Sequence, residues 1–234
     1  MCFSTELEKM KIVAEYFKAK IDQTAFDQYI EFRNAYPNEF KTVGEDLRIF
    51  PNYFGYAIIS EGGQKVIRPM RYQLLPHFSK GPRYTRTNPK TGRQVQISTF
   101  NARVDSLEKR HAWKNIFGKK HCLAVHKKFY EYVEHPKTKK SALISFEGKE
   151  HPLLWSAGLW DRWESPDKKF FIDSYAMVTL DPVQEIEEAG HDRMPAMIER
   201  DLIDSWLNPQ DESLEELYEI LDHREPVQYE FQFA

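Results

Sequence analysis

The chain has 234 residues, of which 41% are hydrophobic and 14% aromatic, so it can bury the core of one large domain and is not a disordered polymer. Its 33 basic and 36 acidic residues give a net charge of −3, which excludes a uniformly basic nucleic-acid-binding protein and leaves only local basic clusters for contact with DNA. No apolar run approaches the roughly 18 residues that span a bilayer, and the first residues do not form a secretion signal.

We therefore expect one domain over residues 1–234, in which residues from about 209 to 234 form a C-terminal helical and strand extension. Cys2 and Cys122 are too few for a disulfide framework, which is typical of a reduced, intracellular protein. We expect a soluble monomer that does not bind membranes and is cytoplasmic, or nucleoid-associated if its source is bacterial.

In chain order, Thr5 and Glu8 fit a capping box that opens a first helix, and a second helix is predicted from Thr24 to a residue before Pro37. Short apolar runs between turn signals then predict seven strands, at residues 56–60, 66–70, 121–125, 128–132, 141–146, 154–161 and 170–180. Helical character returns at residues 182–189, 200–207 and 212–221. Strands and helices do not alternate regularly, so the fold class is α+β with a strand-rich core.

The charges are unevenly distributed, with basic residues concentrated between Arg68 and Lys140 and acidic residues in the last quarter of the chain. This distribution predicts one basic face and one acidic face. Residues 80–93 combine five basic residues with prolines, glycines and a tyrosine. They predict an exposed hairpin-like loop, which is either simply solvated or follows a nucleic-acid strand, and in the second case the loop contributes Arg83, Tyr84 and Arg86.

Cys2 would become the first residue of the mature chain if Met1 were removed. An N-terminal cysteine carries an amine and a thiol on one residue, and its α-amine has a lower pKa than a lysine amine, so more of it is neutral and nucleophilic at pH 7. The amine can form a Schiff base with an aldehyde, and the thiol can then close a thiazolidine ring. The alternative is an incidental cysteine at a frayed terminus.

Three further segments could assist such chemistry. Asn101 could orient a nucleophile while Arg103 holds a phosphate, or the two could lie in an ordinary turn. Glu131 alternates along a predicted strand with aromatic neighbours, so it is either a partly desolvated general acid or an exposed carboxylate. His191 stands two residues before Arg193, and this pair could combine proton transfer with phosphate binding or lie in a surface loop.

We expect neither a metal nor a cofactor. His121 and His126 are five residues apart, and this odd spacing places them on opposite faces of a strand, although His135 follows.

Six segments occur in an order that resembles a known family. These are Met1-Cys2, Met70-Arg71-Tyr72-Gln73-Leu74-Leu75-Pro76, Asn101-Ala102-Arg103, Phe129-Tyr130-Glu131-Tyr132, Ala157-Gly158-Leu159-Trp160-Asp161 and His191-Asp192-Arg193-Met194-Pro195. Together they resemble the SRAP family, the SOS response-associated peptidases that crosslink to abasic sites. The resemblance extends from residue 2 to about residue 208.

The resemblance implies a twisted, barrel-like β core with peripheral helices, and single-stranded DNA containing abasic sites as the partner. It implies that Cys2 is the nucleophile, that Asn101 positions it, that Glu131 assists opening of the sugar ring, and that His191 is the acid/base at the Schiff-base stage. By the same resemblance Arg71, Arg103 and Arg193 contact phosphates, and the site removes Met1 as a self-processing peptidase.

The chain also departs from the family pattern. The family's Trp-Gly after Met-Arg is replaced by Tyr72-Gln73, so that a contact with DNA bases at this position falls to Tyr72, and the usual glycine after Cys2 is Phe3. Two alternatives to covalent capture remain open from the sequence: a non-covalent single-stranded DNA-binding module, and a peptidase that acts on other proteins through Cys2.

Overall fold

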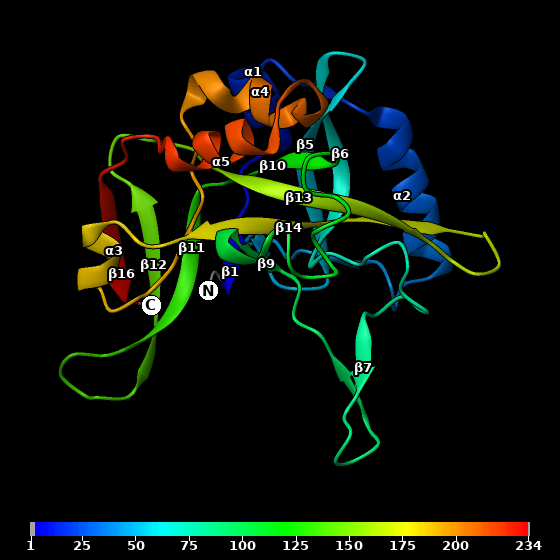
Figure 1. The fold of residues 1–234 in the computed structure, drawn as a ribbon, viewed down its shortest axis with the longest axis horizontal. Coiled ribbons are helices and arrows are strands. Elements are labelled where there is room, and N and C mark those ends of the chain that lie inside the picture. Colours follow the sequence, from blue (N-terminus) through cyan, green and yellow to red (C-terminus); the bar gives the residue numbers. More distant parts are fainter. Residues whose placement is uncertain (1–2, 234) are drawn as a thin grey trace.

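A closed barrel of five strands forms the centre of the protein, in a computed structural model that describes residues 3–233. Its strands are β5 (Tyr53–Glu61), β6 (Gln64–Tyr72), β10 (His121–His126), β13 (Leu154–Glu164) and β14 (Phe171–Leu180). The pairs β6–β5, β5–β10, β10–β13 and β13–β14 are antiparallel, and a parallel pairing of β14 with β6 closes the ring (Figure 1).

The barrel strands are buried along most of their length because they face the core on one side and covering elements on the other. Every residue of β10 is buried, and in β14 only Phe171 is partly exposed. Such strands are near-continuous apolar runs rather than alternating ones, which explains the sequence pattern of these segments.

A second sheet continues from the barrel, because only Lys127 separates β10 from β11 (Lys128–Glu134). In spatial order this sheet holds β16 (Tyr229–Phe233), β12 (Ser141–Gly148), β11, β1 (Ser4–Glu6) and β4 (Arg48–Ile49). The first described strand, β1, therefore lies inside the sheet, between β11 and β4.

Strand β14 also holds two short strands that matter for the site. β9 (Asn101–Arg103) pairs with it in parallel at Met177–Thr179, and β15 (Met194–Pro195) pairs with it antiparallel at Thr179 and Leu180. Two more short strands extend the barrel: β2 (Lys20–Ile21) on β6 and β3 (Lys41–Thr42) on β5.

The helices lie around this β core, as Figure 1 shows. They are α1 (Met10–Phe17), α2 (Gln23–Ala35), α3 (Gln184–Glu188), α4 (Ile203–Leu207) and α5 (Leu214–Asp222), with 3-10 turns at Val104–Ser106, Arg200–Leu202 and Pro209–Asp211. The capping box of Ser213 and Glu216 fixes the start of α5, whose buried side chains include Leu217 and Leu221.

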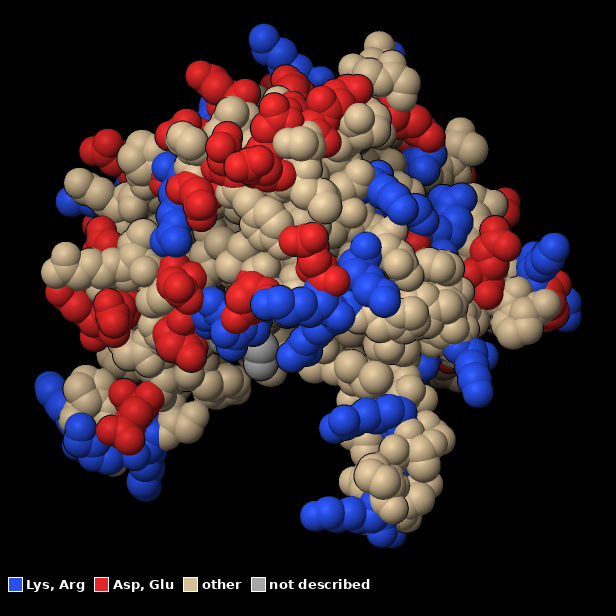
Figure 2. Space-filling model, in the orientation of Figure 1, with Lys and Arg blue, Asp and Glu red and all other residues tan. Residues whose placement is uncertain are grey.

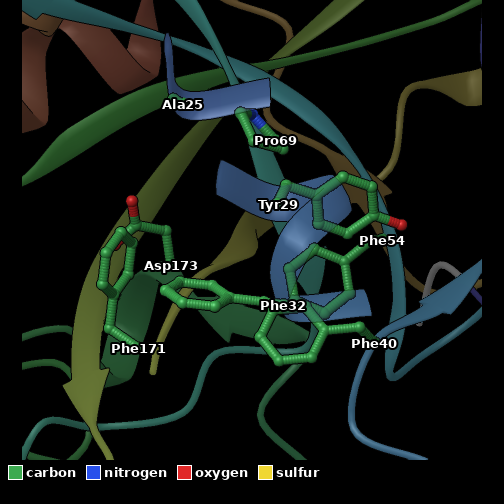
Figure 3. A pocket seen from close by; sticks show the side chains of 8 residues that line it. All are labelled: Ala25, Tyr29, Phe32, Phe40, Phe54, Pro69, Phe171 and Asp173. Atoms are coloured by element: carbon green, nitrogen blue, oxygen red, sulfur yellow. The ribbon is translucent and has the colours of Figure 1, made fainter. Parts of the chain in front are cut away.

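A small apolar cavity lies under α2, between its aromatic side chains and the barrel (Figure 3). Tyr29 and Phe32 of α2 point into it together with Phe40 and Phe54, and burial raises the pKa of Tyr29 to about 12. Its volume is about 20 Å³, room for roughly one water molecule. The cavity is therefore a gap in an aromatic cluster and too small for a substrate.

The structure confirms the seven predicted strands and the second predicted helix, with boundaries that shift by a few residues. The first helix was predicted wrongly at its start: it begins at Met10, and Thr5 lies in β1 instead of capping it. The strand forms because Thr5 pairs with both Phe129 of β11 and Ile49 of β4, partners far away in the sequence. Within residues 3–233, no helix is both long and apolar enough to cross a membrane.

Candidate active site

A buried carboxylate–imidazole pair is the centre of the candidate site. Glu131 Oε2 lies 3.3 Å from His191 Nε2, and the two residues are 3% and 9% exposed. Glu131 lies in the middle of β11, where burial alternates so that it points inward while Tyr132 is 52% exposed. The predicted opposition of Glu131 to its aromatic neighbour on the strand is thus confirmed.

The turn after α3 orients the imidazole of His191. Gly190 ends the helix with a φ of +91°, a conformation that glycine adopts without strain, and the His191 amide then donates to the Ile186 carbonyl. His191 Nδ1 lies 2.8 Å from the carbonyl oxygen of Arg193 and 3.2 Å from the Arg193 amide nitrogen, so the backbone of this turn holds Nδ1. Nε2 of the ring faces the carboxylate of Glu131.

The geometry lets Glu131 and His191 share one proton. When Nε2 carries the proton it donates to the carboxylate, and when the carboxyl group carries the proton it donates to Nε2. A buried pair that can exist in both forms can accept and return a proton without exchange with bulk water. This is the chemistry expected of a general acid/base.

Asn101 is positioned by the barrel. It is the first residue of β9, is 9% exposed, and pairs with Met177 of β14, whose amide donates to the Phe100 carbonyl. On β14, Thr179 is flanked by Arg103 of β9 and by Pro195 of β15. One barrel strand thus carries the segments that contain Asn101 and His191.

The described chain begins beside the strand that carries Glu131. The Phe3 amide donates to the Tyr130 carbonyl at 2.9 Å, and the Phe3 ring packs edge-on against Tyr132, with 5.1 Å between ring centroids. Ser4, the next residue, is fully buried. Cys2, the nucleophile expected from the sequence, lies outside the described residues.

Two of the expected phosphate contacts, Arg103 and Arg193, are paired with aspartates. Arg103 forms a two-point ion pair with Asp105, which raises the pKa of Arg103 and lowers that of Asp105. Arg193 donates to Asp181 at 2.6 Å. We assigned no role to Asp105 or Asp181 from the sequence; the spacing of two residues between Arg103 and Asp105 is a signal that could have indicated the first of these pairs.

Arg71 and Tyr72 lie at the closure of the barrel, where Arg71 pairs with Ser174, and their side chains are 2% and 0% exposed. Arg71 donates to the Pro82 carbonyl, and burial lowers its pKa to about 10. Tyr72 packs against Phe100 and Tyr175. These side chains present no surface to a DNA strand in this structure, because Tyr72 packs in the core and the segment that contains Pro82 covers Arg71.

The basic segment predicted as a hairpin-like loop does contain a hairpin, of β7 (Thr85–Thr87) and β8 (Gln94–Gln96). Arg83 and Arg86 are exposed, whereas Tyr84 is partly buried against Phe78. Figure 1 shows this hairpin projecting from the body on the same side as the loop between β11 and β12. Figure 2 shows the surface hollowed between the two projections, with Lys and Arg side chains on both of them and between them.

The opposite side of the molecule is acidic. Figure 2 shows Asp and Glu side chains gathered over α4 and α5, which agrees with the two faces predicted from the sequence. The acidic residues of this region are Asp201, Asp204, Asp211, Glu212, Glu215, Glu216, Glu219 and Asp222.

The histidines of β10 are buried. His121 Nδ1 contacts the Trp206 carbonyl at 2.9 Å, and its Nε2 accepts from the Gly118 amide at 3.0 Å, so both ring nitrogens have protein partners. His126 is buried on the same strand. Across residues 3–233 we find no cluster of three or more His, Cys, Asp or Glu side chains that could hold a metal ion.

A comparison against protein families identifies the family of the chain. The family model for SOS response associated peptidase (SRAP) matches residues 1–232. The chain belongs to this family, as the order of its motifs predicted.

Similar proteins carry names that refer to abasic sites. The abasic site processing protein YobE of Bacillus subtilis is 26% identical over 200 residues, covering 84% of each chain. The abasic site processing protein YoqW of Bacillus phage SPbeta is 27% identical and covers 84% of this chain and 82% of its own. The abasic site processing protein HMCES of Pongo abelii is 24% identical over 73% of this chain and 53% of its own.

Solved structures share the fold. A crystal structure of a protein from Bordetella bronchiseptica superposes with a TM-score of 0.71 at 17% identity, covering 100% of this chain and 99% of the other. A second, from Bacteroides thetaiotaomicron, gives a TM-score of 0.70 at 17% identity and covers 100% and 92%. The predicted α+β fold with a barrel-like core and peripheral helices is confirmed.

Proposed function

We propose that this protein captures abasic sites in single-stranded DNA by a covalent thiazolidine bond to Cys2, after Met1 has been removed. The observation that carries the proposal is the buried pair of Glu131 and His191, 3.3 Å apart, next to the strand on which the chain begins. The names of the relatives support abasic DNA as the substrate.

The chemistry starts from the ring-opened aldehyde of the abasic sugar. Glu131 promotes the opening by donating a proton to the ring oxygen and accepting one from the C1′ hydroxyl. The neutral amine of Cys2 then adds to C1′ and gives a carbinolamine. His191 protonates the departing hydroxyl, so that one water leaves and a C=N bond forms.

The thiol of Cys2 completes the reaction. Its sulfur bonds to C1′ while its proton passes to the nitrogen, so the C=N bond becomes a C–N bond within a five-membered ring. Amine, thiol and aldehyde together lose one water in total. Because amine and thiol are tethered on one residue, ring closure has the high effective concentration of an intramolecular step.

The same residues account for a self-processing peptidase. Hydrolysis of the bond between Met1 and Cys2 requires an attacking water and a proton for the leaving amine, and the Glu131–His191 pair can exchange both protons. This step exposes the amine that the crosslink needs. A non-covalent single-stranded DNA-binding module remains the second candidate, favoured by the basic hairpin, which supplies exposed cations but no nucleophile.

The test is incubation of the purified protein with a single-stranded oligonucleotide that contains one abasic site, followed by a denaturing gel. We expect a slow-migrating adduct, and intact mass spectrometry should give the sum of DNA and Met1-free protein less one water. Cys2→Ala should abolish the adduct. Cys122→Ala is the matched control, because Cys122 is fully buried and burial raises the pKa of its thiol.

Cys2→Ser separates the two stages. Serine retains the amine but lacks the thiol, so its adduct should stop mainly at the imine and survive the gel only after reduction with borohydride. No adduct from the wild-type protein, or an adduct that Cys2→Ala leaves unchanged, would refute covalent capture. Salt-dependent binding without any adduct would support the binding-module alternative.

A further inference from the structure

Two phosphate candidates of the site, Arg103 and Arg193, share an aspartate. Asp105 accepts from Arg103 Nε at 3.2 Å and from its terminal nitrogen at 2.8 Å. The same carboxylate lies 3.8 Å from Arg193 NH2, too far for a hydrogen bond but close enough for an ion pair. Asp105 therefore occupies the space between the two guanidinium groups.

Arg193 is held from its other end. Its NH1 donates to Asp181 at 2.6 Å, while its side chain is only 6% exposed. Nε and NH2 of Arg193 are buried and have no hydrogen-bond partner among the described residues. These two atoms form one edge of the guanidinium, the edge that binds a two-oxygen anion, and a buried guanidinium edge without acceptors is costly unless a ligand completes it.

A carboxylate and a phosphodiester are interchangeable acceptors for such an edge. Both present two oxygens at a spacing that matches the guanidinium fork. Asp105 already accepts hydrogen bonds from Nε and a terminal nitrogen of Arg103. It also lies beside NH2 of Arg193, on the guanidinium edge described above. A phosphate that binds both arginines must take the position of this carboxylate.

We propose that Asp105 is a displaceable carboxylate that occupies the phosphate position between Arg103 and Arg193 in the free protein and moves away when a DNA strand binds. This inference rests on the proposed function and concerns the control of the same site. Asp105 can move at small cost because its side chain is 54% exposed and lies in a short 3-10 turn. Asp181 has the different role of positioning Arg193 by its NH1.

The consequence is weak binding to strands without a lesion. Every phosphate that enters the position replaces an existing ion pair, so the net gain from the two arginines is reduced. Since Arg193 follows His191 by two residues, the position adjoins the acid/base pair. The protein therefore releases intact DNA readily and is retained where the covalent step follows.

Fluorescence anisotropy with an intact homothymidine oligonucleotide, which cannot be crosslinked, tests the inference on the full chain. We expect Asp105→Asn to lower Kd by about two- to fivefold at low salt, the size of one exposed ion pair. Asp222→Asn on α5 is the matched control, since it makes the same charge change on the acidic side, and should alter Kd by less than Asp105→Asn does. In the Arg103→Gln background, Asp105→Asn should give little further gain.

Unchanged Kd in Asp105→Asn would overturn the inference, as would an equal gain in the Arg103→Gln background, because that gain would reflect net charge alone. Asp105→Ala repeats the measurement without a side chain that can still accept from Arg103. The wild-type crosslinking gel reports separately on the proposed function. A wild-type adduct with unchanged Kd in Asp105→Asn defeats only the displacement, whereas tighter binding by Asp105→Asn without any adduct defeats only covalent capture.

Discussion

Glu131 and His191 are a buried carboxylate and a buried imidazole that lie 60 positions apart in the sequence and meet at 3.3 Å. Here burial brings together two groups that can exchange a proton. Cys122 shows the opposite use of burial. Its thiol lies against Gly158 in the barrel, where burial raises its pKa and keeps it protonated and unreactive.

Glu131→Gln tests the carboxylate without changing its size. The amide cannot transfer a proton, so we expect crosslink formation to slow by about 10²- to 10⁴-fold. Binding of an intact oligonucleotide should change by less than about twofold, since the side chain points into the protein. Single-turnover gels and anisotropy measure the two quantities. Equal losses in rate and affinity would instead indicate a structural role for Glu131.

At the scale of elements, the two buried histidines of β10 make the stability of the fold sensitive to acid. Burial lowers the pKa of His121 to about 3 and that of His126 to about 4, so both rings are neutral in the folded protein. In the unfolded chain both protonate below about pH 6.5. The unfolded state therefore binds more protons, and the free energy of unfolding must fall as the pH drops from about 6.5 toward 4.

We expect the free energy of unfolding to fall by about 1.4 kcal/mol per pH unit for each histidine of β10. Denaturant unfolding of wild type and His126→Leu between pH 7 and 4.5 measures the contribution, which the variant should lack. His111→Gln is the control, because His111 is exposed and should leave the slope unchanged. A slope in His126→Leu as steep as that of wild type would contradict the assignment.

The long barrel strands could be predicted from the sequence because their apolar character is local, as in residues 170–180 for β14. The short strands β1 and β9 could not, since three residues carry too little pattern and their partners are distant in the chain. The site residues were found by the order of motifs, not by periodicity. The contact between Glu131 and His191, and that between Arg193 and Asp181, depend on tertiary packing that no local pattern encodes.

At the scale of the molecule, the β7–β8 hairpin and the β11–β12 loop project as two arms with a hollow between them. The acidic helices α4 and α5 lie at the opposite end of the same view (Figures 1 and 2). Among the described strands, β7 and β8 pair only with each other, so no strand of the core depends on the hairpin for its pairing. Its role must be sought on its exposed surface, where Arg86, Lys90 and Arg93 lie.

Replacing residues 86–95 by an Asn-Gly turn should therefore leave the free energy of unfolding within about 0.5 kcal/mol of wild type. The plot of log affinity for single-stranded DNA against log salt should become shallower by up to about 2, from roughly 0.7 for each of three lost cations. The control changes Lys137, Lys139 and Lys140 of the other arm to Gln. An equally shallow plot in that control would mean that affinity follows overall charge and not the hairpin.

Strand β14 pairs with β13, β6, β9 and β15, so the segments bearing Asn101, Arg103, His191 and Arg193 are registered against a single ribbon of backbone. The hydrogen bonds between β14 and the short strands therefore set the relative positions of these segments, and the connecting loops do not. The connecting loops can then change in length and composition without moving the side chains of the candidate site relative to one another. A change that disrupts β14 would instead displace all four side chains at once. We therefore expect crosslinking to be lost while most of the barrel remains folded.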